Sequence, residues 1–105
     1  MSLDIKHLHA AKPRRHHDGT FDVYGQLQKI KEEFDEVEES SIYWNDQPTG
    51  KNREKQLEEL IDLQTAVYTY AIGAGYTQEE IETAICMVNC KNKLRGYWED
   101  GHDGL

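Results

Sequence analysis

The longest periodic segment of the chain reads REKQLEELIDLQTAVYTYAIGAG and covers residues 53–75. Its apolar residues recur every three or four positions, which is the spacing of an α-helix with one apolar face. We predict a helix over residues 53–74, with Asn52 as its N-cap and a stop at Gly73 and Gly75. The positions that we expect to face inward are Leu57, Leu60, Leu63, Val67, Tyr70, Ala71 and Ala74.

The segment before this helix has the same periodicity. Asp22 is a suitable N-cap for a helix that continues to about Ser41, and the breaker-rich residues 42–52 then form a loop. Its expected inward positions are Val23, Leu27, Ile30, Phe34 and Val37.

A third helix is predicted after the glycines. The sequence Thr77-Gln78-Glu79-Glu80 has the form of a capping box, and the helix should continue to about Trp98. Its expected inward positions are Ile81, Ala84, Ile85 and Val88, followed on the same line by Lys91, Asn92 and Arg95.

These elements predict an all-α protein, a small helical bundle of three main helices plus short terminal segments that is completed by homo-oligomerisation. A chain of 105 residues with 37% apolar residues buries a modest core, so a partner subunit is expected to help. We divide the chain into a basic N-terminal arm (1–20) whose order the sequence leaves open, a helical domain (21–98) and a C-terminal tail (99–105).

Composition restricts the class of ligand and the location. A net charge of −8 argues against binding to a nucleic acid polymer, and any phosphate ligand would need a bridging cation. The sequence has neither an apolar run long enough for a membrane nor a secretory signal, so we expect a cytoplasmic protein. Cys86 and Cys90 lie four apart, which favours small semi-buried residues in a reducing compartment over a disulfide or a metal site.

The strongest chemical signal is a pair of carboxylate couples. Glu33 and Glu36 are three apart in the first helix, as are Glu59 and Asp62 in the second, so each couple projects from one side of its helix. Both couples border the apolar positions. Facing couples there would repel each other, and Mg²⁺ would resolve the conflict because it prefers oxygen ligands and bridges carboxylates to phosphates. The alternative is a solvated acidic surface, as we expect for Glu32, Asp35 and Glu39.

Near the end of the third helix, the inward line becomes polar and basic. Lys91, Asn92 and Arg95 could orient phosphate oxygens, or they could form salt bridges to the acidic helices.

In combination, these motifs resemble those of the MazG-type all-α NTP pyrophosphohydrolases. The order is EExxE at residues 32–36, a gap of 22 residues, ExxD at 59–62, and a helix that ends CKNKLRGYW. The resemblance covers about residues 23–98 and extends to the phosphoribosyl-ATP pyrophosphohydrolases and the dimeric dUTPases. It implies a homodimer or homotetramer with active sites lined by the acidic helices.

The resemblance also implies a reaction and roles for residues. The expected activity is Mg²⁺-dependent hydrolysis of a nucleoside triphosphate to the monophosphate and pyrophosphate, with Mn²⁺ as a substitute ion and nucleotide-pool housecleaning as a role. Glu33, Glu36, Glu59 and Asp62 would bind metal. Lys91, Asn92 and Arg95 would contact phosphates. Glu36 is the expected catalytic residue that orients or deprotonates water, although Glu39 also fits the first couple in a shifted register.

Alternatives remain at the level of sequence. The same site could act on dUTP or phosphoribosyl-ATP, and a non-enzymatic helical interaction module would need no metal. Tyr43, Trp44, Tyr97 and Trp98 could stack on a base, but such residues more often close a core or an interface. The four N-terminal histidines favour exposed residues over a zinc site, because no cysteine accompanies them. They are His7, His9, His16 and His17.

Overall fold

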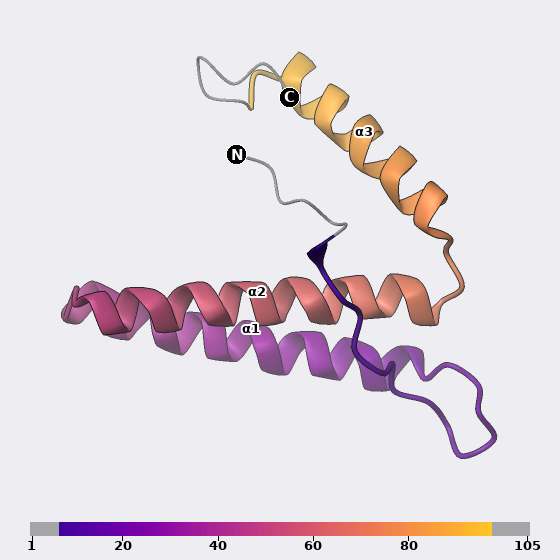
Figure 1. Ribbon diagram of the computed structural model, residues 1–105, viewed down its shortest axis with the longest axis horizontal. Helices are drawn as coiled ribbons and strands as arrows, with labels where there is room; N and C mark the ends of the chain where they lie inside the picture. Colours follow the sequence, from indigo (N-terminus) through magenta and orange to yellow (C-terminus); the bar gives the residue numbers. More distant parts are fainter. Residues whose placement is uncertain (1–6, 98–105) are drawn as a thin grey trace. The chain divides into compact units, whose positions relative to one another are not determined.

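The computed structural model describes residues 7–97, and it confirms an all-α protein (Figure 1). The helices are α1 (Val23–Asp46), α2 (Gly50–Gly73) and α3 (Gln78–Leu94). The only extended pairing in this part of the chain is an isolated bridge between Arg15 and Phe21. The chain divides into two compact units, residues 9–75 with α1 and α2, and the unit that holds α3, and each is described by itself.

Helices α1 and α2 lie side by side as a hairpin with a short connection, residues 47–49 (Figure 1). The predicted N-cap of α1 is confirmed, because the Asp22 side chain accepts a hydrogen bond from the Gly25 N–H at 2.9 Å. The predicted N-cap of α2 is wrong. Thr49 caps this helix, and the Asn52 amide instead donates to the carbonyl of Gln47 at 2.8 Å, which closes the connection.

Helix α1 is longer than predicted and ends at Asp46 rather than near Ser41. Two of the residues that indicated a loop, Asn45 and Asp46, lie in its last turn, and the predicted loop 42–52 is reduced to residues 47–49. Across the hairpin, the Gln56 side chain donates to the Ser41 hydroxyl at 2.9 Å. This contact keeps the two helices paired close to the connection.

The seam between α1 and α2 is polar rather than apolar. The predicted inward residues Leu57, Leu60 and Val67 are 59%, 42% and 51% exposed, so most of the predicted apolar core is absent from the hairpin. Apolar periodicity identifies a face that requires cover, but it does not identify which surface provides it. The residues buried in the hairpin are Gln26, Glu33, Val37, Ser40, Glu59, Ala66 and Thr69.

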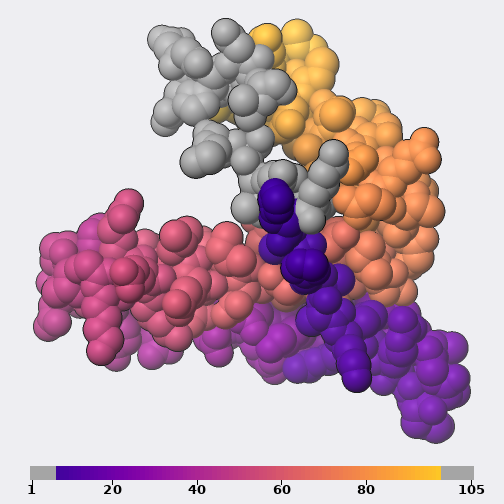
Figure 2. Space-filling view, viewed as in Figure 1, coloured from indigo at the N-terminus to yellow at the C-terminus, as the bar shows by residue number. Residues whose placement is uncertain are grey.

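Residues 9–21, which we call the docked arm, lie across the hairpin (Figure 2). The N–H of Ala11 donates to the Thr69 hydroxyl at 3.0 Å, and the N–H of Arg14 donates to the Gln26 side chain at 3.0 Å. The Gln26 amide in turn donates to the carbonyl of Ala66 at 3.1 Å. These bonds fix the arm's backbone, because both anchoring side chains are almost fully buried.

The other end of the docked arm packs against the end of α2. Phe21 and Tyr70 make an edge-to-face contact with ring centroids 5.2 Å apart. Gly73 lies beneath the arm, and a Cβ atom there would lie 2.5 Å from the Phe21 ring and 2.8 Å from the Pro13 side chain. The close approach of arm and helix therefore requires glycine at this position.

Helix α3 begins as predicted but ends earlier. Both hydrogen bonds of the capping box are present between Thr77 and Glu80. The helix ends at Leu94 rather than near Trp98, which lies outside the described residues. Gly96 has φ of +72°, its N–H donates to the Lys93 carbonyl, and the Tyr97 N–H donates to the Asn92 carbonyl. This pattern is a Schellman motif, which terminates a helix at glycine.

The cysteines and the membrane-spanning potential of the helices were also predicted from the sequence. Cys86 and Cys90 are unpaired, but both are exposed rather than semi-buried. Within residues 7–97, no helix combines the length and the apolar character needed to cross a membrane.

Candidate metal centre

Three of the four predicted ligands meet between α1 and α2. Glu33, Glu59 and Asp62 each bring one carboxylate oxygen to within 4.8 Å of the others. Glu33 is 8% exposed and Glu59 is 5% exposed, whereas Asp62 is open to solvent. Two carboxylates of the cluster are therefore buried between the helices, and the third is exposed to solvent.

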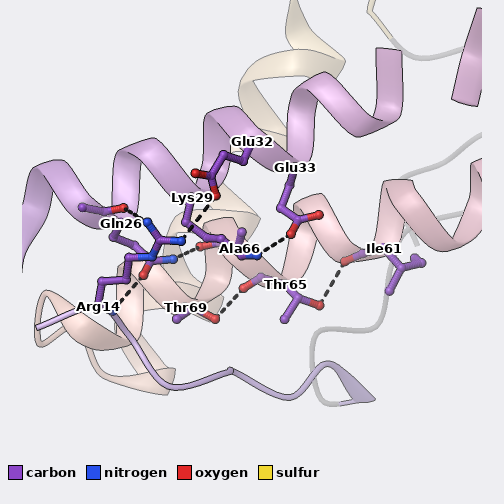
Figure 3. Close-up of polar contacts among 10 residues, drawn as sticks. Arg14, Gln26, Lys29, Glu32, Glu33, Ile61, Thr65, Ala66 and Thr69 are labelled. Carbon is purple, nitrogen blue, oxygen red and sulfur yellow. Dashed lines mark hydrogen bonds and ion pairs between the residues drawn. The ribbon is translucent and has the colours of Figure 1, made fainter. Parts of the chain in front are cut away.

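Each of the two buried carboxylates has one satisfied and one unsatisfied oxygen. Glu33 Oε1 lies 2.7 Å from the Lys29 ammonium, and Glu59 Oε1 lies 2.7 Å from the Lys55 ammonium. Figure 3 shows Lys29 turned toward Glu33. The second oxygens, Glu33 Oε2 and Glu59 Oε2, are buried without a hydrogen-bond partner among the described residues. Burial of a carboxylate oxygen without a hydrogen bond is costly, so these two atoms are the unusual feature of the seam.

The electrostatics of the centre separate two of its acids. A hydrogen bond that only the protonated Glu36 carboxyl can donate to Glu59, together with the negative charges of Glu33 and Glu59, raises the pKa of Glu36. The hydrogen bond from Lys55 lowers the pKa of Glu59 despite the opposing effect of burial. Glu59 is thus held as the anion, while Glu36 retains a greater affinity for a proton.

The donor set fits a hard divalent cation. It consists of carboxylate oxygens from two helices, with no histidine or cysteine in the cluster as found within residues 7–97. Mg²⁺ and Mn²⁺ take such ligands, whereas zinc sites usually include nitrogen or sulfur donors. The two orphaned oxygens supply the positions that such an ion would satisfy.

A cavity of about 300 Å³ lies at each side of the carboxylates. The first is bounded by Glu36, Glu59 and Lys55, together with Tyr43 and Asn52. The second is bounded by Glu33, Asp62 and Lys29, with Lys12 and Arg14 of the docked arm at its rim. Each cavity therefore combines carboxylates of the centre with at least one cation.

The fourth predicted ligand, Glu36, lies outside the cluster of three but borders the first cavity. The cluster contains Glu33, as the EExxE register predicted. Glu39 lines the same cavity as Glu36 but does not belong to the cluster of three carboxylates. The structure thus brings Glu33 together with Glu59 and Asp62 and leaves Glu36 outside this cluster.

The predicted phosphate-binding residues belong to the other unit. Lys91 and Arg95 are exposed on α3, Arg95 at its C-cap, and Asn92 is half-buried. Their contact with phosphate stays a prediction. Of the aromatic candidates, Tyr43 lines a cavity, Trp44 is half-buried and Tyr97 is exposed.

Sequence reasoning missed the lysines of the centre. Lys29 and Lys55 each stand four residues before a buried glutamate, which is the i,i+4 spacing of helical ion pairs. It also missed the anchors Gln26 and Thr69, whose partners are backbone groups that no local pattern indicates.

Comparison with known proteins identified no relative, since no family model, no curated protein and no solved structure matched the chain.

Proposed function

We propose that this protein is a Mg²⁺-dependent nucleoside triphosphate pyrophosphohydrolase. One observation carries the proposal: two facing, buried carboxylates with orphaned oxygens lie beside a third carboxylate, in the order of motifs that resembles the MazG-type enzymes. A purely structural seam would gain little from burying two carboxylates that each leave one oxygen without a hydrogen bond, because an apolar pair of similar size would pack there at lower cost.

Glu33, Glu59 and Asp62 would hold the ion. When bound, Mg²⁺ supplies charge for the phosphate oxygens and a lower pKa for a coordinated water. Glu36 is placed to accept the proton of the attacking water, because it borders the cavity that Glu59 also lines and its pKa is raised. A carboxylate with a raised pKa is a stronger base near neutral pH.

Phosphate binding and base recognition would use further residues of the two units. Lys91, Asn92 and Arg95 are the proposed contacts from α3, as the resemblance implies. Tyr43 offers a stacking surface in the cavity that also contains Glu36, and the Asn52 side chain adds an amide there. The base, the sugar and the alternative substrates dUTP and phosphoribosyl-ATP are to be distinguished by assay.

A second copy of the chain is the proposed cover for the exposed apolar faces of α1 and α2. Leu27 and Phe34 on α1 are 46% and 50% exposed, and Leu57 and Val67 on α2 are similarly open. Large apolar side chains exposed along helices in this way favour an interface. Light scattering should give a dimer or tetramer for the wild type and a smaller species for Phe34→Glu, whereas a monomeric wild type would contradict the proposal.

The activity is tested by pyrophosphate release from a panel of canonical and damaged NTPs and dNTPs, with dUTP and phosphoribosyl-ATP included. We expect release that requires Mg²⁺ and that Glu36→Ala abolishes. The matched control is Glu38→Ala, an exposed acid of the same helix that borders neither cavity. No release from any nucleotide, together with a melting temperature that Mg²⁺ leaves unchanged, would instead favour the interaction module.

A further inference from the structure

The two buried carboxylates are neutralised in the same way. Each receives an ammonium group from a lysine one turn earlier on its own helix, Lys29 for Glu33 and Lys55 for Glu59, both at 2.7 Å. We call this pair the counter-lysines. Two positive charges therefore occupy the region where the proposed function requires a divalent cation.

The partners in each pair differ in their freedom to move. The side chains of Lys29 and Lys55 are 42% and 62% exposed, whereas those of Glu33 and Glu59 are 11% and 6% exposed. The carboxylates are held in the seam, while each lysine reaches them along a flexible stem from solvent. An exchange of partners would therefore move the lysines and leave the carboxylates in place.

The two cavities give each displaced ammonium group a second position. Lys29 lines the cavity that also has Lys12 and Arg14 at its rim, and Lys55 lines the cavity on the other side. Both cavities adjoin the carboxylates and are large enough for phosphate groups, at about 300 Å³ each. A polyphosphate bridged to an ion at the carboxylates would present its oxygens at these lysines.

We propose that the counter-lysines hold the place of the metal's charge in the metal-free protein and bind phosphate oxygens once the metal is present. This inference rests on the proposed function and adds two phosphate-binding residues to it. It gives each lysine two opposing effects, because an ammonium beside the carboxylates competes with a divalent cation but attracts a polyanion. A lysine with a purely structural role would not produce both.

The test measures two affinities for Lys29→Met, Lys55→Met and the double variant. Mn²⁺ binding is measured by electron paramagnetic resonance on the full chain without nucleotide, and tripolyphosphate binding is measured by calorimetry on the Mn²⁺-loaded protein. We expect Mn²⁺ to bind about 3- to 10-fold more tightly to each single variant, since a nearby like charge is removed. Tripolyphosphate should bind about 10-fold more weakly, since a charge-assisted hydrogen bond is lost.

Lys31→Met and Lys51→Met are the matched controls. Both residues are exposed on the same two helices and border neither cavity, so both affinities should stay within about 2-fold of wild type. Lys29→Gln and Lys55→Gln provide a second set of variants if the methionine forms do not fold.

The outcomes separate this inference from the proposed function. A wild type that binds no Mn²⁺ overturns the metal centre, and the inference falls with it. Tight Mn²⁺ binding by the wild type, with variants that bind Mn²⁺ no better or tripolyphosphate equally well, overturns the inference alone. Pyrophosphate release by the wild type would then still stand.

Discussion

The seam of the α1–α2 hairpin has two polar regions that differ in how completely their buried groups are hydrogen-bonded. Around Gln26 and Thr69, every side-chain group that the structure places in the seam has a partner: the Ala11 and Arg14 N–H groups and the Thr65 and Ala66 carbonyls. Farther along, Glu33 and Glu59 are also buried, yet one oxygen of each has no hydrogen-bond partner within the described residues.

The difference separates the polar groups that maintain the fold from those that the proposed function assigns to a metal ion. A fully satisfied network rigidifies a structure, whereas a buried oxygen without a hydrogen bond is a persistent cost. Burial alone does not distinguish the two regions, and polarity does not either. The count of satisfied atoms does: Gln26 belongs to the scaffold, and Glu59 is the residue that the proposed function places in the metal centre.

The largest expected effect lies in the carboxylate region. Glu59→Gln should weaken Mn²⁺ binding by at least about 100-fold, because it removes a charged ligand, and ligand losses exceed those of outer-shell changes. The melting temperature of the metal-free protein should fall by no more than about 5 °C, since the variant weakens an ion pair to the largely exposed Lys55. Calorimetric titration and thermal melting measure the two effects. A large loss of metal-free stability would place Glu59 in the scaffold instead.

The anchor region should show the opposite pattern. Gln26→Ala should lower the free energy of unfolding by about 2–4 kcal/mol, because two buried backbone groups lose their partners and a cavity remains. The expected fall in melting temperature is roughly 10–20 °C. Mn²⁺ affinity, measured at a temperature where the variant is folded, should change by less than about 3-fold. A collapse of metal binding would mean that the two regions are one unit.

A pair of glycines sharpens the role of the docked arm. Gly73→Ala should cost about 1–3 kcal/mol, because the new methyl group would overlap Phe21 and Pro13. Gly50→Ala is the control, since a Cβ atom there meets nothing within 4 Å and alanine favours the helix. Denaturant unfolding measures both. Equal stability of the two variants would show that the arm yields easily.

The smallest effect concerns Glu36. Its raised folded-state pKa means that the folded protein holds this proton more tightly than the unfolded chain, so metal-free stability falls as pH rises through the raised pKa. Glu36→Gln should therefore raise the metal-free melting temperature at pH 7 by roughly 1–3 °C and have less effect near pH 4. Glu38→Gln is the control. A lower melting temperature at pH 7 would contradict repulsion at Glu36.

Local patterns predicted the parts of this structure that local physics determines. Asp22 and Thr77 were predicted as caps and are confirmed, because a side-chain acceptor satisfies backbone donors within one turn. Three of the four carboxylates of the two couples lie together, and Glu36 lies outside that cluster. Gly96 carried a readable stop signal for α3, whereas the prediction extended the helix to about Trp98.

Long-range choices were beyond such patterns. The apolar positions of α1 and α2 formed consistent stripes, but the hairpin closes on its polar side, and periodicity cannot rank two competing faces. The Thr49 cap was missed because Asn52 is an equally good N-cap by residue type. The docking of the arm depends on Gln26 and Thr69 reaching backbone groups 12 and 58 residues away.

The manner in which the arm is anchored has a consequence for how this protein can change over evolution. Gln26 and Thr69 bind main-chain amides of Arg14 and Ala11, so these two hydrogen bonds do not depend on side-chain identity and exclude only proline at those positions. Residues 11 and 12 can therefore vary while the backbone path persists, whereas Arg14 also pairs with Glu32. These residues border a cavity beside the carboxylates. Substitutions there would change the chemistry of the cavity wall, and with it the ligand that the cavity prefers, while the fold stays the same.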